Sequence, residues 1–372
     1  MTLPCRMVPP RPAIIGAGPI GLEVHWALKR EGLDPLHYDA GPIGSTINWW
    51  APGTRFFSSP ERIAICGVPL VTPTQDKATR EEYLSYLRSV AAQFELRVRT
   101  FERVTALEHQ PMGGAPRLAD EPAIEPSAGP FSLSTQSAAG NHAHRATHVI
   151  AAIGDMHRPR TLNIPGEDLP HAGHYLKDPH LYFRRRVLIV GGKNSAVEAA
   201  IRLYRVGAAV TLSYRRAEFD EHRIKYWLLP EIKGLIKSGH IRFEPLTTPL
   251  AITPAGATLT RHDSTGAEIG PVFDVPADDV LLLTGYEMDG SLLAAAGVEL
   301  SGPQHAPTFN PSTMETNVPG LYVAGTATAG TQHRFRAFIE NCHIHAERIV
   351  AHILGRSAPD AAPETPLAAL ES

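Results

Sequence analysis

The chain has 372 residues, with 35 Lys and Arg against 38 Asp and Glu, which gives a formal net charge of −3. At roughly 150 residues per domain, this length predicts two or three domains and excludes a small scaffold held together by disulfides. The charges are spread evenly along the sequence, so neither a nucleic acid nor a membrane surface is predicted as a partner.

The cysteines indicate a reducing environment. Cys5, Cys66 and Cys342 are far apart in sequence and form no CxxC pair, no zinc-type spacing and no even-numbered disulfide framework. Residues 1–12 lack the apolar core of a signal peptide, and no run of about eighteen apolar residues occurs anywhere. We therefore expect a cytoplasmic protein without a metal site.

The first motif is a glycine-rich turn between a strand and a helix. Residues 13–15 form a short apolar run, and Gly16, Gly18 and Gly21 follow as G-x-G-x-x-G. Apolar residues then recur at helical spacing up to Gly32, and residues 36–39 are typical of a second strand. This order predicts a βαβ unit that binds a dinucleotide.

A second motif nearly repeats the first 175 residues later. The apolar run 187–190 leads into Gly191-Gly192-Lys193-Asn194-Ser195-Ala196, a helical pattern that Gly207 ends, and a further strand at 210–212. Lys193 replaces the middle glycine of the fingerprint. Its charge could neutralise a pyrophosphate, or it could be an ordinary exposed loop lysine.

The residues that follow each second strand predict different ligands. Asp39 lies 23 residues after Gly16, where a carboxylate can accept a hydrogen bond from a ribose 2′-hydroxyl. The position equivalent by count in the second unit is Tyr214, followed by Arg215 and Arg216, whose guanidinium groups suit a 2′-phosphate. The first unit should therefore bind an adenine dinucleotide with a free 2′-hydroxyl, and the second NADPH.

The rest of the chain supplies connecting elements. Residues 148–154 and 280–286 are apolar strands that end in glycine or shortly after one, and 316–326 should form a turn, a strand and a glycine. Residues 111–146 are expected to be a β-meander with flexible loops, 334–354 a helix and 357–372 a disordered tail. Residues 63–67, which include Cys66, are typical of a buried strand or strand end.

These features together resemble the thioredoxin-reductase-like flavoproteins, and several segments are similar to the bacillithiol disulfide reductase (YpdA-like) family. The segments that carry the second resemblance are RFFSS at 55–59, IPGEDLP at 164–170, GGKNS at 191–195, WLLPE at 227–231, METNV at 314–318 and FIEN at 338–341. Because the resemblance covers residues 13 to 355, it implies one fold for nearly the whole chain.

The implied fold is α/β, with two Rossmann-like dinucleotide-binding domains and the NADPH domain inserted into a split FAD domain. Residues 1–175 and 288–356 would form the FAD-binding domain, 176–287 the NADPH-binding domain and 357–372 a flexible tail. The expected FAD contacts are Gly16, Gly18, Pro19, Ile20, Gly21, Asp39, Gly154, Gly325 and Thr326. The expected NADPH contacts are Gly191, Gly192, Lys193, Asn194, Ser195, Arg215 and Arg216.

The resemblance also implies a function. NADPH would reduce the flavin, which would pass two electrons to a low-molecular-weight disulfide or to a small redox protein, and the chain would form a homo-oligomer. Two positions depart from the family pattern: Ile20 stands where its redox cysteine is expected, and Thr326 replaces the aspartate of a Gly-Asp pair. Cys342, with His343 beside it, is the candidate catalytic thiol, and the alternative is that it packs the core.

Two other functions remain open. One is a cysteine-independent flavoenzyme, either similar to ferredoxin or flavodoxin NADP reductases or a flavin monooxygenase. The other is a non-enzymatic sensor that binds NADPH and FAD.

Overall fold

The computed structural model describes residues 11–109, 129–332 and 336–357. The chain divides into two compact units. Unit 1 contains the described residues up to Asn48, Ser58–His157 and those from Glu287 onward, and unit 2 contains Trp49–Phe57 and Arg158–Tyr286. Residues 158–175, which were expected in the first domain, lie in unit 2.

Unit 1 is built on a parallel sheet in the order β19-β6-β1-β2. The strands are short and fully buried: β1 (Ala13–Ile15), β2 (Leu36–Tyr38), β6 (Val149–Ala151) and β19 (Leu321–Val323). Because side chains alternate along a strand, Ile14 packs on one face with helices α1 (Pro19–Arg30) and α8 (Ile344–Ile353). Ala13 and Ile15 pack on the other face.

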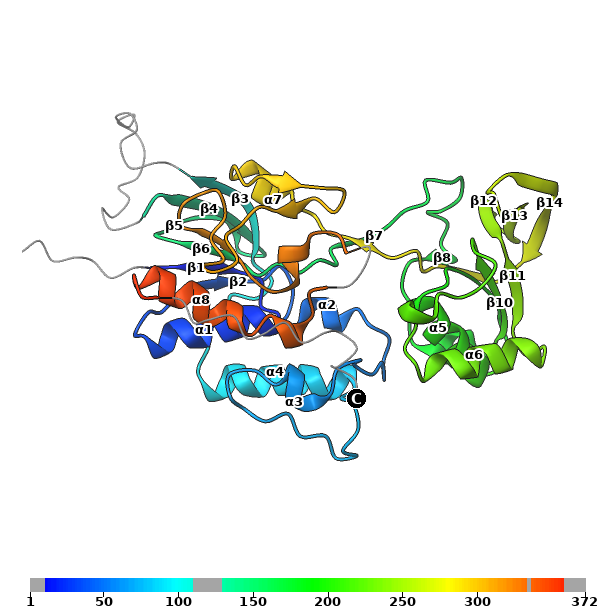
Figure 1. The fold of residues 1–372 in the computed structure, drawn as a ribbon, viewed down its shortest axis with the longest axis horizontal. Coiled ribbons are helices and arrows are strands. Elements are labelled where there is room, and N and C mark those ends of the chain that lie inside the picture. Colours follow the sequence, from blue (N-terminus) through cyan, green and yellow to red (C-terminus); the bar gives the residue numbers. More distant parts are fainter. Residues whose placement is uncertain (1–10, 110–128, 333–335, 358–372) are drawn as a thin grey trace, which may run out of the picture. The chain divides into compact units, whose positions relative to one another are not determined.

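The other face of this sheet is covered by an antiparallel meander, β3-β4-β5. Its strands are β3 (Arg103–His109), β4 (Phe131–Ser137) and β5 (Gly140–Ala146). Helix α7 (Ser291–Ala295) lies on the same side (Figure 1). Residues 110–128 of the expected meander lie outside the described residues. The remaining α-helices in the described part of unit 1 are α2 (Ser45–Asn48), α3 (Pro60–Ile63) and α4 (Arg80–Gln93). Two-residue strands are β17 (Leu300–Ser301) and β18 (Ala306–Pro307).

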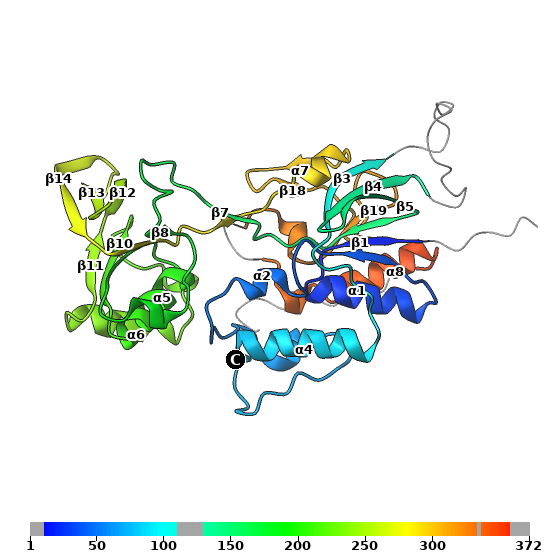
Figure 2. The same ribbon diagram turned by 180° about the vertical axis from the view of Figure 1, so that it is seen from behind.

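Unit 2 repeats this plan. Its parallel sheet has the order β11-β10-β9-β15-β8, with α5 and α6 on one face and an antiparallel sheet, β12-β13-β14, on the other (Figure 2). The helices are α5 (Asn194–Arg205) and α6 (Leu228–Lys237). The parallel strands are β8 (Ala172–Gly173), β9 (Arg186–Val190), β10 (Ala209–Tyr214), β11 (Arg242–Pro245) and β15 (Asp279–Leu282). The antiparallel strands are β12 (Thr247–Thr253), β13 (Gly256–His262) and β14 (Glu268–Pro276). The two-residue strands β7 (Arg158–Pro159) and β16 (Tyr286–Glu287) lie where the chain passes from one unit to the other.

Two local predictions were wrong. The helix expected over 334–354 begins only at Ile344, because carboxamides replace the helical hydrogen bonds before it: Asn341 Oδ1 accepts from the Phe338 N–H at 2.8 Å, and Gln332 Oε1 accepts from the Ala337 N–H at 3.0 Å. Residues 63–67 do not form a strand, since α3 ends at Ile63 and Cys66 has a positive φ of 58°. The tail residues 358–372 lie outside the described part.

Among the described residues, no helix is both long and apolar enough to cross a membrane. In the same part of the chain, no group of three or more His, Cys, Asp or Glu side chains could hold a metal ion.

Candidate functional site

The glycine-rich turn of unit 1 lies between β1 and α1, and its three glycines meet three different constraints. Gly16 has φ +106°, and a Cβ atom there would overlap the Ala152 carbonyl. A Cβ at Gly21 would overlap the carbonyl oxygen of Gly16, so helix and strand pack this closely only with glycine. A Cβ at Gly18 would meet nothing within 4 Å. The open space at Gly18 fits a pyrophosphate approaching the backbone.

The start of α1 leaves its N–H groups available for such an anion. Gly18 is its N-cap residue, no side chain caps it, and its first turn contains no acidic residue. Helix α4 is different, because Thr79 and Glu82 form a complete capping box at its start. The uncapped terminus and its dipole make α1 suitable for binding phosphate.

Asp39 closes the other side of the turn. Its Oδ2 accepts the Ala17 N–H at 2.7 Å and its Oδ1 accepts the Gly41 N–H at 2.8 Å. Each carboxylate oxygen has a further lone pair, so both can still accept from ribose hydroxyls. Burial raises the pKa of Asp39, and these two backbone donors oppose the rise. The backbone N–H groups of Ala17 and Gly41 therefore orient the Asp39 carboxylate without a ligand.

The ends of three parallel strands bring the other predicted residues of unit 1 to this turn. Ile20 is buried, and a Cβ at Gly325, after β19, would lie 3.4 Å from its Cβ. Gly154, after β6, is the neighbour of Thr326, whose Oγ1 would be 3.8 Å from a Cβ at Gly154. The carboxyl ends of β1, β6 and β19 thus gather the residues expected to contact FAD, as ends of parallel strands do in such folds.

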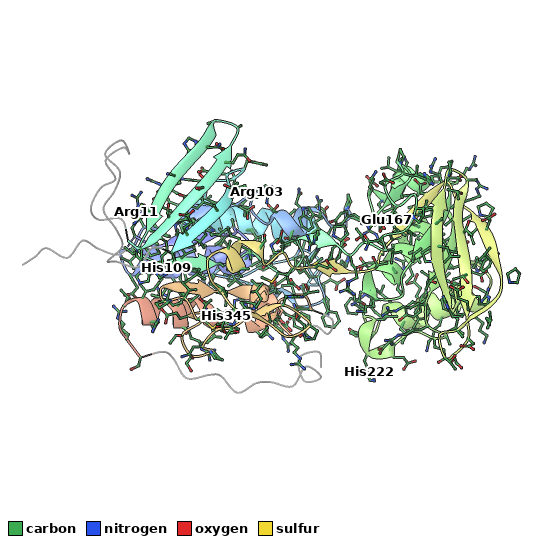
Figure 3. The ribbon with its side chains drawn as sticks, turned by 90° about the horizontal axis from the view of Figure 1, so that it is seen from above. Arg11, Arg103, His109, Glu167, His222 and His345 are labelled. Carbon is green, nitrogen blue, oxygen red and sulfur yellow. The ribbon has the colours of Figure 1, made fainter. Side chains whose placement is uncertain are left out.

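Three residues at this edge were not predicted from the sequence. Asp155 accepts a hydrogen bond from Gln332 Nε2 at 2.9 Å and another from Thr326, and burial raises its pKa. His345, labelled in Figure 3, accepts the Gly325 N–H on Nδ1 at 3.1 Å, and burial lowers its pKa to about 4. The position of Asp155 directly after Gly154 was a sequence signal that its side chain lies at this edge of the sheet.

The two cysteines in the described part of the chain do not have the environment of reactive thiols. Cys342 is only 1% exposed, and burial together with the negative charges of Asp155 and Glu23 raises its pKa. His343 binds Glu23 instead, with 2.8 Å between Nδ1 and Oε2. His343, whose position next to Cys342 made that cysteine a candidate thiol, therefore does not lower its pKa. Cys66 is also buried with a raised pKa, as expected for a core residue, and Cys5 lies outside the described residues.

The turn of unit 2 leads from β9 into α5. Gly192 lies so close to the Tyr214 ring that a Cβ would overlap it. Lys193 has an extended backbone with φ −112°, so its side chain causes no strain and is exposed. The buried Ala196 takes the place of the third glycine. Helix α5, like α1, has no side-chain cap and no acidic residue in its first turn.

The polar residues around this second turn come from α5 and from the segment after β10. Asn194 Oδ1 accepts the Lys225 N–H at 2.7 Å, and Lys225 Nζ lies 3.0 Å from Glu198 Oε2 on the same helix. Arg215 and Arg216 are exposed directly after β10, with Arg216 3.4 Å from Asp220. Ser195 is exposed in the first turn of α5. The bond between Asn194 and the Lys225 N–H thus connects the segment that follows the two arginines to the turn.

Comparisons with known proteins agree with this geometry. The family model described as "Pyridine nucleotide-disulphide oxidoreductase" matches residues 13–113 and 122–325. The chain is 33% identical over 350 residues to the bacilliredoxin reductase Bdr of Bacillus subtilis, covering 94% of this chain and 99% of the relative. It is 27% identical over 318 residues to a ferredoxin–NADP reductase of Ignicoccus hospitalis, covering 85% and 89%.

A solved structure matches over the same extent. It is the bacillithiol disulfide reductase Bdr (YpdA) from Bacillus cereus, with a TM-score of 0.81 and 32% identity, and the match covers 93% of this chain and 99% of that one. The resemblance inferred from the sequence segments is confirmed, and so is the predicted α/β fold with two dinucleotide-binding domains.

Proposed function

We propose, because this chain belongs to the pyridine nucleotide-disulphide oxidoreductase family, that it is an NADPH-dependent FAD enzyme that reduces a low-molecular-weight disulfide. The family makes the chain a flavin-dependent oxidoreductase that uses a nicotinamide nucleotide. The choice of FAD and NADPH, the residues that bind them and the disulfide are our proposal. The observation that carries the proposal is the 33% identity to a bacilliredoxin reductase over 94% of the chain.

Unit 1 is the proposed FAD site. The space in front of Gly18 and the uncapped start of α1 suit a pyrophosphate, and Asp39 is in place to accept from ribose. The segments around Gly154 and Gly325 lie at the same edge of the sheet and would surround the flavin end of the molecule. FAD, when bound, supplies a carrier of two electrons between the nicotinamide and the disulfide.

Unit 2 is the proposed NADPH site. The N–H groups at the start of α5 would bind the pyrophosphate, with the exposed Lys193 beside them. Arg215 and Arg216 would bind the 2′-phosphate, for which planar guanidinium groups are well suited. Tyr214, at the position of Asp39 in unit 1, brings no carboxylate that would repel that phosphate.

The overall reaction consumes one NADPH, one proton and one disulfide, and it yields NADP⁺ and two thiols. Cys342 remains a predicted participant, but its burial and raised pKa favour a route without a protein thiolate.

We also propose that the protein is cytoplasmic and forms a homo-oligomer. Size-exclusion chromatography with light scattering would test the oligomeric state.

A second candidate is a reductase of a small redox protein such as ferredoxin. Ile20 occupies the loop position expected for a redox cysteine, and the described thiols are buried, so an acceptor that needs no protein thiol fits these features. The similarity to a ferredoxin–NADP reductase over 85% of the chain supports this candidate.

One experiment separates these functions. The purified protein is mixed with NADPH without oxygen, and bleaching of the flavin absorbance is recorded. Bacillithiol disulfide, cystine, ferredoxin and oxygen are then added in separate runs. The proposal requires a disulfide to reoxidise the flavin faster than oxygen does. Faster reoxidation by ferredoxin alone would favour the second candidate, and turnover with any acceptor excludes a non-enzymatic sensor.

A further inference from the structure

The phosphate-binding turn of unit 1 is held by a pair of buried histidines, His25 on α1 and His37 on β2. Both side chains are fully buried, with relative exposures of 0%. The two Nδ1 atoms are 3.0 Å apart, and His37 Nε2 lies 3.0 Å from the carbonyl oxygen of Gly16. Gly16 is the first glycine of the turn, so the histidines contact the backbone that a dinucleotide would approach.

The contacts determine which nitrogen carries each proton. A carbonyl oxygen only accepts, so His37 Nε2 donates to Gly16. Burial lowers the pKa of His37 to about 3 and that of His25 to about 4, so both rings are neutral near pH 7. His37 Nδ1 therefore accepts from His25 Nδ1. His25 Nε2 is then an unprotonated nitrogen, and it is buried without a hydrogen-bond partner.

His37 and Asp39 act on the same peptide group. His37 lies in β2, and Asp39 directly follows the last residue of this strand. His37 binds the carbonyl of Gly16, and Asp39 binds the N–H of Ala17 at 2.7 Å. These two atoms belong to one peptide plane, which is consequently fixed from both sides.

The second turn of the chain lacks this arrangement. The residue equivalent to His37 by count is Leu212, which pairs with Ile189 in β9 as His37 pairs with Ile14 in β1. Leu212 is buried among apolar side chains and has no donor. The pair of His25 and His37, which we call the histidine clamp, is therefore an additional feature of the turn in unit 1, since the turn in unit 2 forms without such a pair.

We propose that His37 is a positioning residue that sets the phosphate-binding turn for FAD, and that His25 fixes the tautomer that His37 needs. The inference rests on the proposed FAD site. Because the peptide group is already oriented, ligand binding does not include the entropic cost of ordering the turn, and the affinity increases. Loss of the donor would also leave the carbonyl of Gly16 without its buried partner.

The test compares His37→Gln with His37→Met in the full-length protein. The two side chains have the same length, but only Gln carries an N–H donor at the position of Nε2. FAD affinity is measured by titrating protein stripped of flavin. We expect Met to weaken FAD binding about 10- to 100-fold and Gln to remain within about threefold of the wild type. NADPH affinity in unit 2 should change in neither variant.

Two controls keep the test decisive. Leu36→Ala removes buried side-chain volume from the same strand without touching the donor, and it should leave FAD affinity within about threefold. His37→Leu replaces His37→Met if the latter does not fold. Equal FAD affinity in wild type and His37→Met would overturn the inference, and so would equal weakening by Gln and Met.

A second readout does not depend on FAD. Amide hydrogen exchange of the peptide that contains Ala17 should accelerate in His37→Met and not in His37→Gln. If the wild type binds no FAD at all, the proposed function fails. Faster exchange in His37→Met alone then still supports the clamp, whereas unchanged exchange rejects it.

Discussion

Mild acid should destabilise unit 1 through its buried imidazoles. In the folded chain burial lowers the pKa of His25 to about 4 and that of His37 to about 3. In the unfolded chain both return to the ordinary value of about 6.5. Below pH 6.5 the unfolded state therefore binds more protons than the folded state. The contribution of the two neutral imidazoles to the free energy of unfolding is fully present above about pH 6.5. It is lost as the pH falls toward their pKa values in the folded chain.

The size of the effect follows from these values. Between pH 7.5 and pH 5, each unfolded imidazole gains close to one proton while its folded counterpart stays largely neutral. Over the roughly 1.5 pH units between pH 6.5 and pH 5, the loss of stability is about 2 kcal/mol for each histidine. The pair should consequently cost the folded state about 4 kcal/mol at pH 5, a large part of the stability of an ordinary domain.

Urea denaturation of the wild type and of His25→Asn/His37→Gln, followed by circular dichroism at pH 7.5 and pH 5, measures this difference. The other titrating groups are common to both proteins, so their contributions cancel in the comparison. The wild type should lose about 4 kcal/mol more than the variant over this range. Equal losses in the two proteins would refute the assignment of buried, neutral imidazoles.

The remaining predictions concern the two ligand sites and the thiol. Gly18→Ala should leave the melting temperature within about 3 °C but weaken FAD binding more than tenfold, because the added Cβ meets only the open space in front of the turn; unchanged affinity would mean that no phosphate approaches there. Arg215→Glu/Arg216→Glu should raise the KM for NADPH at least tenfold more than that for NADH, and equal effects would reject the 2′-phosphate site. Asn194→Ala should raise the KM for NADPH about fivefold through loss of its bond to the Lys225 N–H, with FAD affinity as the unaffected control. Cys342→Ser should retain disulfide turnover within about threefold, since the thiol is buried with a raised pKa; a loss above about 100-fold would establish a catalytic thiol.

The sequence was sufficient for the parts of the fold that local chemistry determines. Gly16 and Gly21 each meet a constraint of the backbone itself, and Gly18 leaves the space in front of the turn open, so their spacing predicts the turn without knowledge of distant residues. The paired motifs also predicted that the α/β architecture occurs twice. The position of Asp39 against the turn could be predicted because its distance along the chain from Gly16 is set by one helix and one strand.

Contacts between residues far apart in sequence could not be predicted in this way. His37 stands in an apolar strand, where a single histidine gives no signal, and its role depends on His25 of the neighbouring helix. The helix expected from residue 334 failed for a similar reason. The carboxamides of Gln332 and Asn341 bind backbone groups that a continuous helix would have used, and periodicity of apolar residues does not detect this competition.

The two turns of this chain both join a parallel strand to a helix but are held by different contacts, and the difference suits their proposed ligands. In unit 1, His37 of β2 and Asp39 directly after it bind the carbonyl and the N–H of one peptide group, so the turn is ordered before any ligand arrives. In unit 2 the equivalent positions are Leu212 and Tyr214, and Gly192 is only packed against the tyrosine ring. A preorganised turn increases affinity, which benefits a prosthetic group that stays bound through many turnovers. A coenzyme that must leave as NADP⁺ after every turnover gains nothing from the same clamp, because tighter product binding would slow its release.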